Sequence, residues 1–553
     1  REQPPALAVQ HADAPEVVHP ALVQQRAQHL GRRARRALGV VERDGDDVLD
    51  RAARQLDRAE APGDRPALIV DRLGIRPADL VRRGETIFRE RYAGRDEICR
   101  YLQWAADRLD LRKDIRFNSR LTKAAFDKAS GLWTFETGNG DHYRARHFLS
   151  SPGPISTPIM PDIPGLDTFR GQVIHTARWP ETYPDFAGKR VGIIGTGSSG
   201  TQVIPIVAGQ CGHLTVFLRT PNFYAPARNR PLTQDDYDWW EQNRDLTRDR
   251  LQNCQRWGGG DLMLDDAVND VMFRKASEFT PEERRDIYER RWECGGGVVG
   301  WAFCDAMIDK AVNDEAADFL RSKIRTIVKD PDVAETLTPK GFAYGTKRCT
   351  VGTDFYETFN RENVEVVDVK AEPIARFTET GAVVGAREIP LDILISASRF
   401  DALTGALTVI DVRGEDGRSL AEVWGDGPHT YLGISVQGFP NMYMIGGPGS
   451  PSVLTNVVMT NEMQVNWIAD LIGYAERNGY TRCETTSEAQ DTWTQHVNDL
   501  VKGNLWETAD SWYVGSNVPG KPRVILAYVG GYGTYKQRCI EEREQGYPGF
   551  RFS

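Results

Sequence analysis

The ten residues VGIIGTGSSG, Val191 to Gly200, decide the fold that this sequence predicts. An apolar strand over Arg190–Ile194 runs into glycines at G-x-G-x-x-G spacing, and an apolar-rich helix follows. In such a turn the first glycine allows a tight bend, the second lets backbone approach a pyrophosphate, and the third lets the helix pack on the strand. The free N–H groups at the helix N-terminus favour an anion. The expected dinucleotide contacts are Gly195, Thr196, Gly197, Ser198, Ser199, Gly200 and Gln202.

The next strand indicates which dinucleotide binds. It reads HLTVFLRT, residues 213–220, and ends in Arg219 and Thr220, about twenty residues after the glycine loop. An NAD site would place Asp or Glu here to hold the ribose 2′-hydroxyl, whereas a cation and a hydroxyl suit a 2′-phosphate. The sequence therefore predicts an NADP site. The alternative is that Arg219 is a solvated surface residue.

The stretch FRGQVIHTARWP, residues 169–180, comes just before the glycine loop and matches F-x-G-x-x-x-H-x-x-x-W-P at every specified position. It resembles the fingerprint of the Baeyer–Villiger monooxygenases, flavoenzymes that use NADPH and O2 to convert ketones to esters or lactones. Related flavin monooxygenases that oxidise nitrogen or sulfur usually lack the Trp-Pro ending. We interpret the histidine as a residue that couples two domains, not as a proton donor. The fingerprint residues are Phe169, Gly171, His175, Trp179 and Pro180.

A second motif, GFAYGTKRCT over residues 341–350, is similar to the family segment in which G-T-K-R supplies a lysine to the NADP 2′-phosphate and an arginine beside the flavin. The resemblance implies that Lys347 joins Arg219 and Thr220, and that Arg348 is the catalytic residue. It also implies the reaction: NADPH reduces FAD, O2 adds to give a C4a-peroxyflavin, and the peroxide attacks the ketone carbonyl. A fixed guanidinium would stabilise the negative charge that develops. The alternative is that both cations are surface charge.

Three further stretches resemble cofactor-binding parts of the family. Asn441 to Ile472 reads as strand, glycine-proline loop and helix, and its central residues would lie against the flavin ring. SWYVGSNVPGKPR, residues 511–523, is similar to a mobile loop that closes over NADP. A glycine in SSPGPISTP would stand where the chain crosses from the flavin domain to the NADP domain. The residues assigned to cofactors in this way are Gly153, Ser452, Val453, Leu454, Val457 and Trp512.

Residues 1–87 depart from the family, whose members open with a strand and a G-x-G-x-x-G loop for FAD. No such motif occurs before Gly195, and there is no aromatic residue before Phe88. The segment is rich in Arg, Ala, Asp and Pro, a composition that buries little apolar surface. Our hypothesis is that it was translated out of frame from a GC-rich gene; the alternative is a divergent N-terminal extension. The family's catalytic Asp would fall here and is not assigned.

A second departure lies in LDILISASRFDALTGAL, residues 391–407, where the family has A-T-G-F-D-A. The family glycine allows close approach of the cofactor, and Arg399 stands in its place. We expect its Cβ and long cationic arm to crowd the flavin.

The predicted fold class is α/β, with two Rossmann-like dinucleotide-binding domains, for FAD and NADP, and a helical insertion. The expected order is 1–87 (anomalous), 88–154 (FAD domain), 155–230 (NADP domain), 231–340 (helical insertion), 341–395 (NADP domain) and 396–553 (FAD domain). Thr280 and Pro281 predict a helix start within the insertion, and Asp330-Pro331 is expected to end a later helix.

Composition limits the partners. The net charge is −9 and the isoelectric point about 5.7, which argues against nucleic acid or an anionic membrane surface. No apolar run approaches the roughly eighteen residues of a membrane span, and the N-terminus lacks a signal-peptide core. Eight scattered cysteines without C-x-x-C pairs predict a reduced, cytoplasmic chain without a metal site. The expected partners are a ketone and O2; the sequence indicates no oligomeric state.

Two alternatives accompany the main interpretation. A heteroatom-oxidising flavin monooxygenase is the nearest, and Trp179-Pro180 argues against it. The other is a non-catalytic, NADP-binding remnant without a competent FAD site. The missing first glycine loop and Arg399 favour that second alternative.

Overall fold

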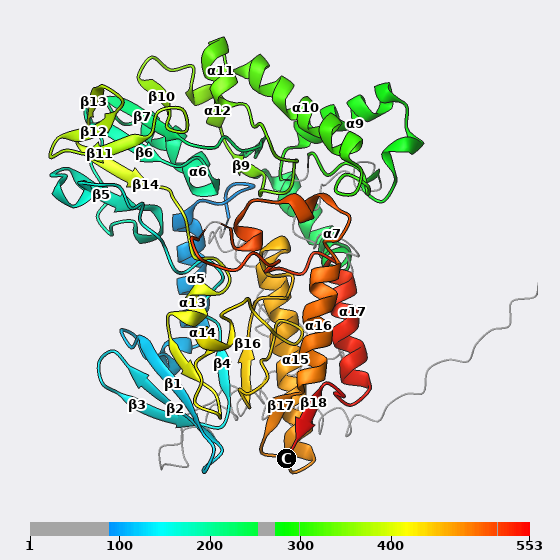
Figure 1. The fold of residues 1–553 in the computed structure, drawn as a ribbon. Coiled ribbons are helices and arrows are strands. Elements are labelled where there is room, and N and C mark those ends of the chain that lie inside the picture. The colour runs from blue at the N-terminus through cyan, green and yellow to red at the C-terminus, as the bar shows by residue number, and fades with distance from the viewer. Residues whose placement is uncertain (1–87, 253–270, 298, 517) are drawn as a thin grey trace, which may run out of the picture.

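The structure is a computed structural model that describes residues 88–252 and 271–553, except positions 298 and 517. The hypotheses on residues 1–87, including the frameshift, therefore lie outside the described residues. The described chain forms an upper lobe around a parallel sheet and a lower lobe around long helices (Figure 1).

The upper lobe is built on the predicted strand–loop–helix. Its five-stranded sheet is parallel throughout and has the order β10-β7-β6-β14-β5. Val191, Ile193, Leu214 and Val216 are fully buried, as expected for a parallel sheet covered on both faces. The strands and the helix that follows the glycine loop are β5 (Gln172–His175), β6 (Arg190–Ile194), α6 (Ser198–Ala208), β7 (His213–Leu218), β10 (Val364–Asp368) and β14 (Ile393–Ser396).

A helical segment lies between the short parallel pair β8 and β9. Thr280 caps the predicted helix through a capping box with Glu283, which confirms that helix start. Asp330-Pro331 does not simply end a helix: Asp330 accepts from two backbone N–H groups and caps a new helix, α11. The elements are β8 (Tyr224–Pro226), α7 (Gln234–Gln252), α9 (Pro281–Cys294), α10 (Lys310–Ile327), α11 (Pro331–Leu337), β9 (Thr350–Gly352) and α12 (Phe355–Thr358).

Two small sheets flank the lobes. A hairpin turns at Asn139 and Gly140, and Gly140 lies in the left-handed region, with φ 86°. It belongs to a four-stranded sheet of order β15-β1-β2-β3, and a three-stranded meander forms the other sheet. The strands are β1 (Leu121–Asp127), β2 (Leu132–Thr137), β3 (His142–Ala145) and β15 (Asp411–Arg413), and β11 (Ile374–Phe377), β12 (Gly381–Val384) and β13 (Arg387–Pro390).

The lower lobe has three long helices that pack around a cluster of large aromatic side chains (Figure 1). Trp467, Trp493 and Tyr535 are buried in this cluster. Two strand pairs accompany the helices, β4 with β16 in parallel and β17 with β18 antiparallel. The elements are β4 (Phe148–Ser150), β16 (Met442–Met444), α15 (Val457–Arg477), β17 (Cys483–Thr485), α16 (Ser487–Asp499), α17 (Tyr532–Glu544) and β18 (Phe550–Phe552).

An amphipathic helix, α5 (Arg95–Arg108), begins shortly after the start of the described residues, and none of its side chains is buried there. On its apolar face Ile98 is 44% exposed and Leu102 is 58% exposed. Within the same described residues, β4 pairs only with β16. The described part of the lower lobe therefore leaves part of this apolar face exposed.

Two chain segments cross between the lobes side by side. Ile159 N–H donates to the Arg399 carbonyl at 2.9 Å, and Asp401 N–H donates to the Thr157 carbonyl at 2.9 Å. Arg399 is half-buried, and its φ is not among the left-handed values of the chain. The backbone at this position therefore does not need glycine for its conformation. The effect of the Arg399 side chain on flavin binding stays a prediction.

Candidate active site

The three glycines of the loop meet different surroundings. Gly195 has φ 103°, and a Cβ there would lie 2.7 Å from the Ala397 carbonyl oxygen of the neighbouring strand segment. A Cβ on Gly200 would overlap the carbonyl oxygen of Gly195. A Cβ on Gly197 would have no atom within 4 Å. The first and third glycines are therefore required by packing, and only the second opens onto free space.

That space lies at the N-terminus of α6, where Gly197 is the N-cap and no side chain caps the helix. Ser198 and Gln202 are exposed on this side, whereas Thr196 is buried beneath the loop. The first N–H groups of a helix have no partner within it. Uncapped N–H groups and the helix dipole can hold a pyrophosphate here.

The predicted phosphate-binding cations come together. Arg219 and Thr220 follow directly after β7 and are exposed, and Lys347 is half-buried nearby. The pKa of Lys347 is lowered by burial, and the charge of Arg219 lowers it further, while Asp510 opposes this shift. Lys347 Nζ donates to the Asp510 carbonyl. Two neighbouring cations are a favourable place for a phosphate, whose negative charge would relieve their repulsion.

Arg348 contacts a different segment from Lys347. Its Nη1 donates to the Val453 carbonyl at 2.7 Å, while its own carbonyl accepts from Asn222 Nδ2 at 2.6 Å. The side chain is otherwise exposed. The structure thus places Arg348 beside the predicted flavin-contacting segment and Lys347 beside the predicted phosphate site.

The predicted flavin-contacting segment begins in the lower lobe with a short 3-10 helix, Ser452–Leu454. Ser452 is 1% exposed and holds a left-handed backbone, with φ 42°. Leu454 and Val457 are half-buried, and Asn456 caps α15 by accepting from Met459 N–H at 3.2 Å. In the next turn, Asn461 Oδ1 is buried and has no hydrogen-bond partner among the described residues. An acceptor in this state fits a site at which a ligand supplies the donor.

The loop over residues 511–523 lies across both lobes. Trp512 is half-buried, with its ring 4.2 Å from that of Tyr513. Lys521 Nζ forms an ion pair with Asp401 Oδ1 at 2.6 Å and donates to the Ala402 carbonyl at 3.0 Å. The loop is thereby attached to the crossing segment. Trp512 as a cofactor contact stays a prediction.

The fingerprint residues lie at the edge of the sheet. His175 ends β5, is 6% exposed and stands 5.7 Å from the ring of Phe400 in the crossing segment. Its Nδ1 accepts from Ala177 N–H, and its Nε2 is buried with no partner in the part of the chain that the structure describes. Burial lowers the pKa of His175 and the charge of Arg178 lowers it further. A neutral ring against the crossing segment agrees with a coupling role.

The remaining predicted residues serve local packing or turns. Phe169 is buried against Phe377, and a Cβ on Gly171 would meet the Asp392 carbonyl at 2.5 Å. Trp179 packs with Tyr183 and Phe186, and Pro180 is half-buried. Gly153 has φ 83° in the first crossing segment.

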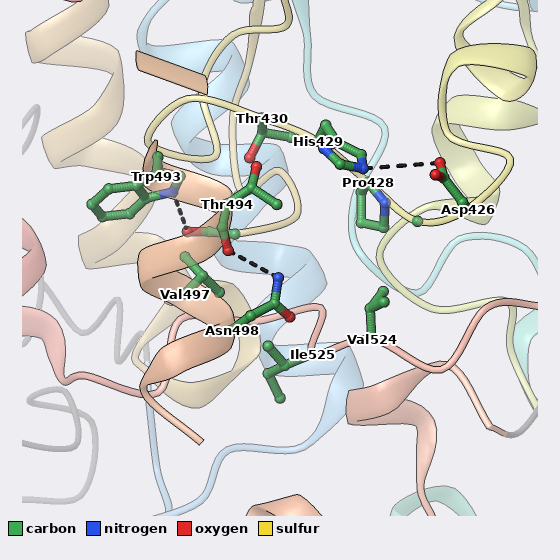
Figure 2. Close-up of a pocket in the computed structure, with 12 residues that line it drawn as sticks. Asp426, Pro428, His429, Thr430, Trp493, Thr494, Val497, Asn498, Val524 and Ile525 are labelled. Carbon is green, nitrogen blue, oxygen red and sulfur yellow. Dashed lines mark hydrogen bonds and ion pairs between the residues drawn. The ribbon is translucent and has the colours of Figure 1, made fainter. Parts of the chain in front are cut away.

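A pocket of about 180 Å³ lies elsewhere, between α16 and the chain that follows the 511–523 loop (Figure 2). Trp493, Thr494 and Asn498 line it from α16, and Val524 and Ile525 from the opposite side. None of the predicted site residues lines this pocket. The described residues contain no cluster of side chains that could hold a metal ion.

The sequence did not reveal several residues that build the site. Asn222 holds the Arg348 carbonyl, and Lys521 ties the 511–523 loop to Asp401. Asn313 makes a buried contact with the chain just before the Lys347 turn. A signal existed for Asn313, because it is a polar residue on the apolar stripe of α10 that Leu320 also occupies.

This fold and site define a class of oxidoreductases in which an NADP-binding parallel sheet is joined to a second dinucleotide-binding domain. A family model of L-lysine 6-monooxygenase/L-ornithine 5-monooxygenase matches residues 86–256. Acetone monooxygenase (methyl acetate-forming) of Gordonia sp. strain TY-5 is 38% identical over 84% of this chain and 86% of its own. Cyclohexanone 1,2-monooxygenase of Acinetobacter sp. is 36% identical over 84% and 83%.

Solved structures agree in fold. Oxidized steroid monooxygenase bound to NADP is 42% identical, with a TM-score of 0.78. OTEMO in complex with FAD and NADP is 35% identical, with a TM-score of 0.79. Both cover 84% of this chain and 86% of the solved chain. The chain belongs to the Baeyer–Villiger monooxygenase family, the FAD- and NADPH-dependent monooxygenases that the fingerprint predicted.

Acetone monooxygenase and cyclohexanone 1,2-monooxygenase support the main interpretation and not the two alternatives. No helix in the described ranges is long and apolar enough to cross a membrane.

Proposed function

We propose that this enzyme converts a small-molecule ketone, O2, NADPH and a proton to an ester or lactone, NADP⁺ and water. One oxygen atom of O2 enters the bond next to the carbonyl, and the other leaves as water. We place the reaction in the cytoplasm, in agreement with the described cysteines, none of which forms a disulfide.

One observation supports this proposal: two consecutive cations contact different segments, Lys347 the Asp510 carbonyl and Arg348 the Val453 carbonyl. Lys347 lies where the charge of Arg219 affects its pKa, and Arg348 donates to the Val453 carbonyl. A single turn thus contributes to both the nicotinamide cofactor and the oxygenation site.

On the NADP side, the N-terminus of α6 would hold the pyrophosphate above Gly197. Arg219, Thr220 and Lys347 would hold the 2′-phosphate by charge-assisted hydrogen bonds. The NADP domain boundaries predicted above remain part of this proposal.

On the flavin side, residues 452–457 and the N-terminus of α15 would lie against the ring, and the orphaned Asn461 Oδ1 would gain a donor. Bound FAD supplies the redox and oxygen chemistry. Arg348 is positioned to stabilise negative charge at the reacting oxygen, since its guanidinium is held by the Val453 carbonyl. The half-buried Trp512 would help to exclude water from this site.

The test is ketone-dependent NADPH consumption with detection of the ester by mass spectrometry, using ¹⁸O2 to follow the inserted atom. The protein is first incubated with FAD, and a panel of linear, cyclic and steroid ketones is supplied. We expect one ¹⁸O atom in the ester. NADPH oxidation that yields only hydrogen peroxide with every ketone, or an oxidised amine or sulfide in place of an ester, would contradict the proposal.

A further inference from the structure

The turn that carries Lys347 and Arg348 is anchored at Tyr344, inside the helical segment of the upper lobe. Tyr344 is fully buried, with its ring 5.4 Å from that of Phe223. Its hydroxyl accepts from Gly300 N–H at 3.3 Å and donates to the Gly297 carbonyl at 3.2 Å. The side chain therefore fixes one end of the turn.

The backbone of Tyr344 is held by one side chain, Asn313 of α10. Tyr344 N–H donates to Asn313 Oδ1 at 2.9 Å, and Asn313 Nδ2 donates to the Tyr344 carbonyl at 3.0 Å. Nδ2 also donates to the Ala306 carbonyl at 2.8 Å. Asn313 is 0% exposed, so water cannot replace these bonds.

The other end of the turn is held by separate contacts. Arg348 accepts from Asn222 through its carbonyl, and Thr350 N–H donates to the Phe223 carbonyl at 2.8 Å as β9 begins. Only residues 345–347 lie between the two anchors, and Gly345 takes a left-handed conformation with φ 86°. A span this short passes a displacement of Tyr344 directly to Lys347.

We propose that Asn313 is a positioning residue for cofactor selection: by holding both peptide groups of Tyr344 it sets the place of the Lys347 ammonium beside Arg219, and thus the preference for NADP over NAD. This inference rests on the proposed role of Lys347 at the 2′-phosphate. Asn313 touches no cofactor itself; it acts through the backbone of the turn. Removing its amide leaves two buried peptide groups of Tyr344 without partners, and the turn must move to satisfy them.

The chain offers a matched control in Asn360, which makes the same kind of contact at the C-terminal end of the same helix. Its Oδ1 accepts from Lys329 N–H at 2.8 Å, and its Nδ2 donates to the Ile327 carbonyl at 2.9 Å. Asn360→Ala therefore removes a comparable backbone clamp from α10 without releasing the Lys347 turn. A general weakening of α10 would affect both variants alike.

The experiment measures the dissociation constants of NADP⁺ and NAD⁺ by calorimetry for the full chain and for Asn313→Ala, Asn360→Ala and Lys347→Met. No flavin turnover is needed. For Asn313→Ala we expect the NADP⁺ constant to rise about tenfold, which is about 1.4 kcal/mol, and the NAD⁺ constant to change less than about twofold. For Asn360→Ala the ratio of the two constants should stay within about twofold of the parent ratio.

Each result has one meaning. An unchanged ratio in Lys347→Met shows that the role of Lys347 in the proposed function is wrong. A changed ratio in Lys347→Met with an unchanged ratio in Asn313→Ala overturns the present inference alone. Equal loss of both nucleotides in Asn313→Ala overturns it as well, because that result is a structural defect and not a displaced ammonium.

Folding of the variants is checked by hydrogen exchange with mass spectrometry. We expect faster exchange in Asn313→Ala over residues 341–350, and in Asn360→Ala at 327–329, with the rest of the chain unchanged. If Asn313→Ala does not fold, Asn313→Ser, whose hydroxyl can keep one of the bonds, replaces it, and a smaller shift of the same ratio is expected. Parent-like exchange over 341–350 in a folded variant would contradict the clamp.

Discussion

A single methyl group at Gly197 should separate cofactor binding from folding. The backbone of Gly197 has φ −72° and ψ −169°, which alanine adopts readily, and its Cβ would have no atom within 4 Å. Alanine lowers the entropy of the unfolded chain, a gain of about 0.4–1 kcal/mol. It is also a poorer N-cap than glycine, a loss of up to about 1 kcal/mol. The free energy of unfolding should therefore change by less than about 1 kcal/mol.

The same methyl group would stand in the space that the pyrophosphate needs above the N-terminus of α6. We expect Gly197→Ala to raise the NADP⁺ dissociation constant at least about tenfold, or about 1.4 kcal/mol. Gly200→Ala is the matched contrast, because its Cβ would overlap the Gly195 carbonyl oxygen and so force the strand and helix apart. That displacement should cost about 2 kcal/mol or more of stability.

Urea unfolding, followed by tryptophan fluorescence, gives the stabilities, and calorimetry gives the affinities. If Gly197→Ala binds NADP⁺ as tightly as the parent, the pyrophosphate does not pass over this residue and the reasoning on the loop is wrong. If Gly200→Ala unfolds at the parent urea concentration, the close approach of helix and strand is not required.

Three more predictions follow from single side chains. Burial, with a smaller effect of the Arg146 charge, lowers the pKa of His147 from 6.5 to about 4. Between these two pH values the unfolded chain binds a proton on this histidine and the folded chain does not, so the free energy of unfolding should fall by about 2 kcal/mol from about pH 7 to about pH 5. His147→Gln should remove that part of the loss in urea titrations. Arg348→Met should lower the rate of ester formation about a hundredfold or more while NADP⁺ affinity, measured by calorimetry, stays within about twofold; an active Arg348→Met enzyme would show that the guanidinium is not needed. Lys521→Met should lower the free energy of unfolding by about 1–3 kcal/mol, because the side chains of its ion pair with Asp401 are only 12% and 26% exposed. Lys502→Met should lower it by less than about 1 kcal/mol in the same assay, because the side chains of its ion pair are 66% and 46% exposed.

Local patterns in the sequence were sufficient for the elements of the NADP-binding turn. The predicted strand over Arg190–Ile194 has the same bounds in the structure, and the close packing predicted at the first and third glycines is present. The Thr280 cap was also predictable, because a capping box depends on residues three apart. The end of α10 before Asp330-Pro331 was predicted correctly, but the new helix that Asp330 caps was not, since Asp-Pro can follow one helix and begin another with equal ease.

The sequence by itself determined the family and the order of its motifs, because the fingerprint, the glycine loop and the G-T-K-R segment are each encoded by neighbouring residues. Only the tertiary structure decided which of these motifs meet. Asn313 lies 31 residues from Tyr344, and Arg348 lies 105 residues from Val453. No periodicity records such pairings, since they arise when buried polar groups must find partners across separate elements during packing. The exposed part of the apolar face of α5 was likewise invisible in the sequence, because an apolar stripe predicts that a helix will pack but not which segment covers it.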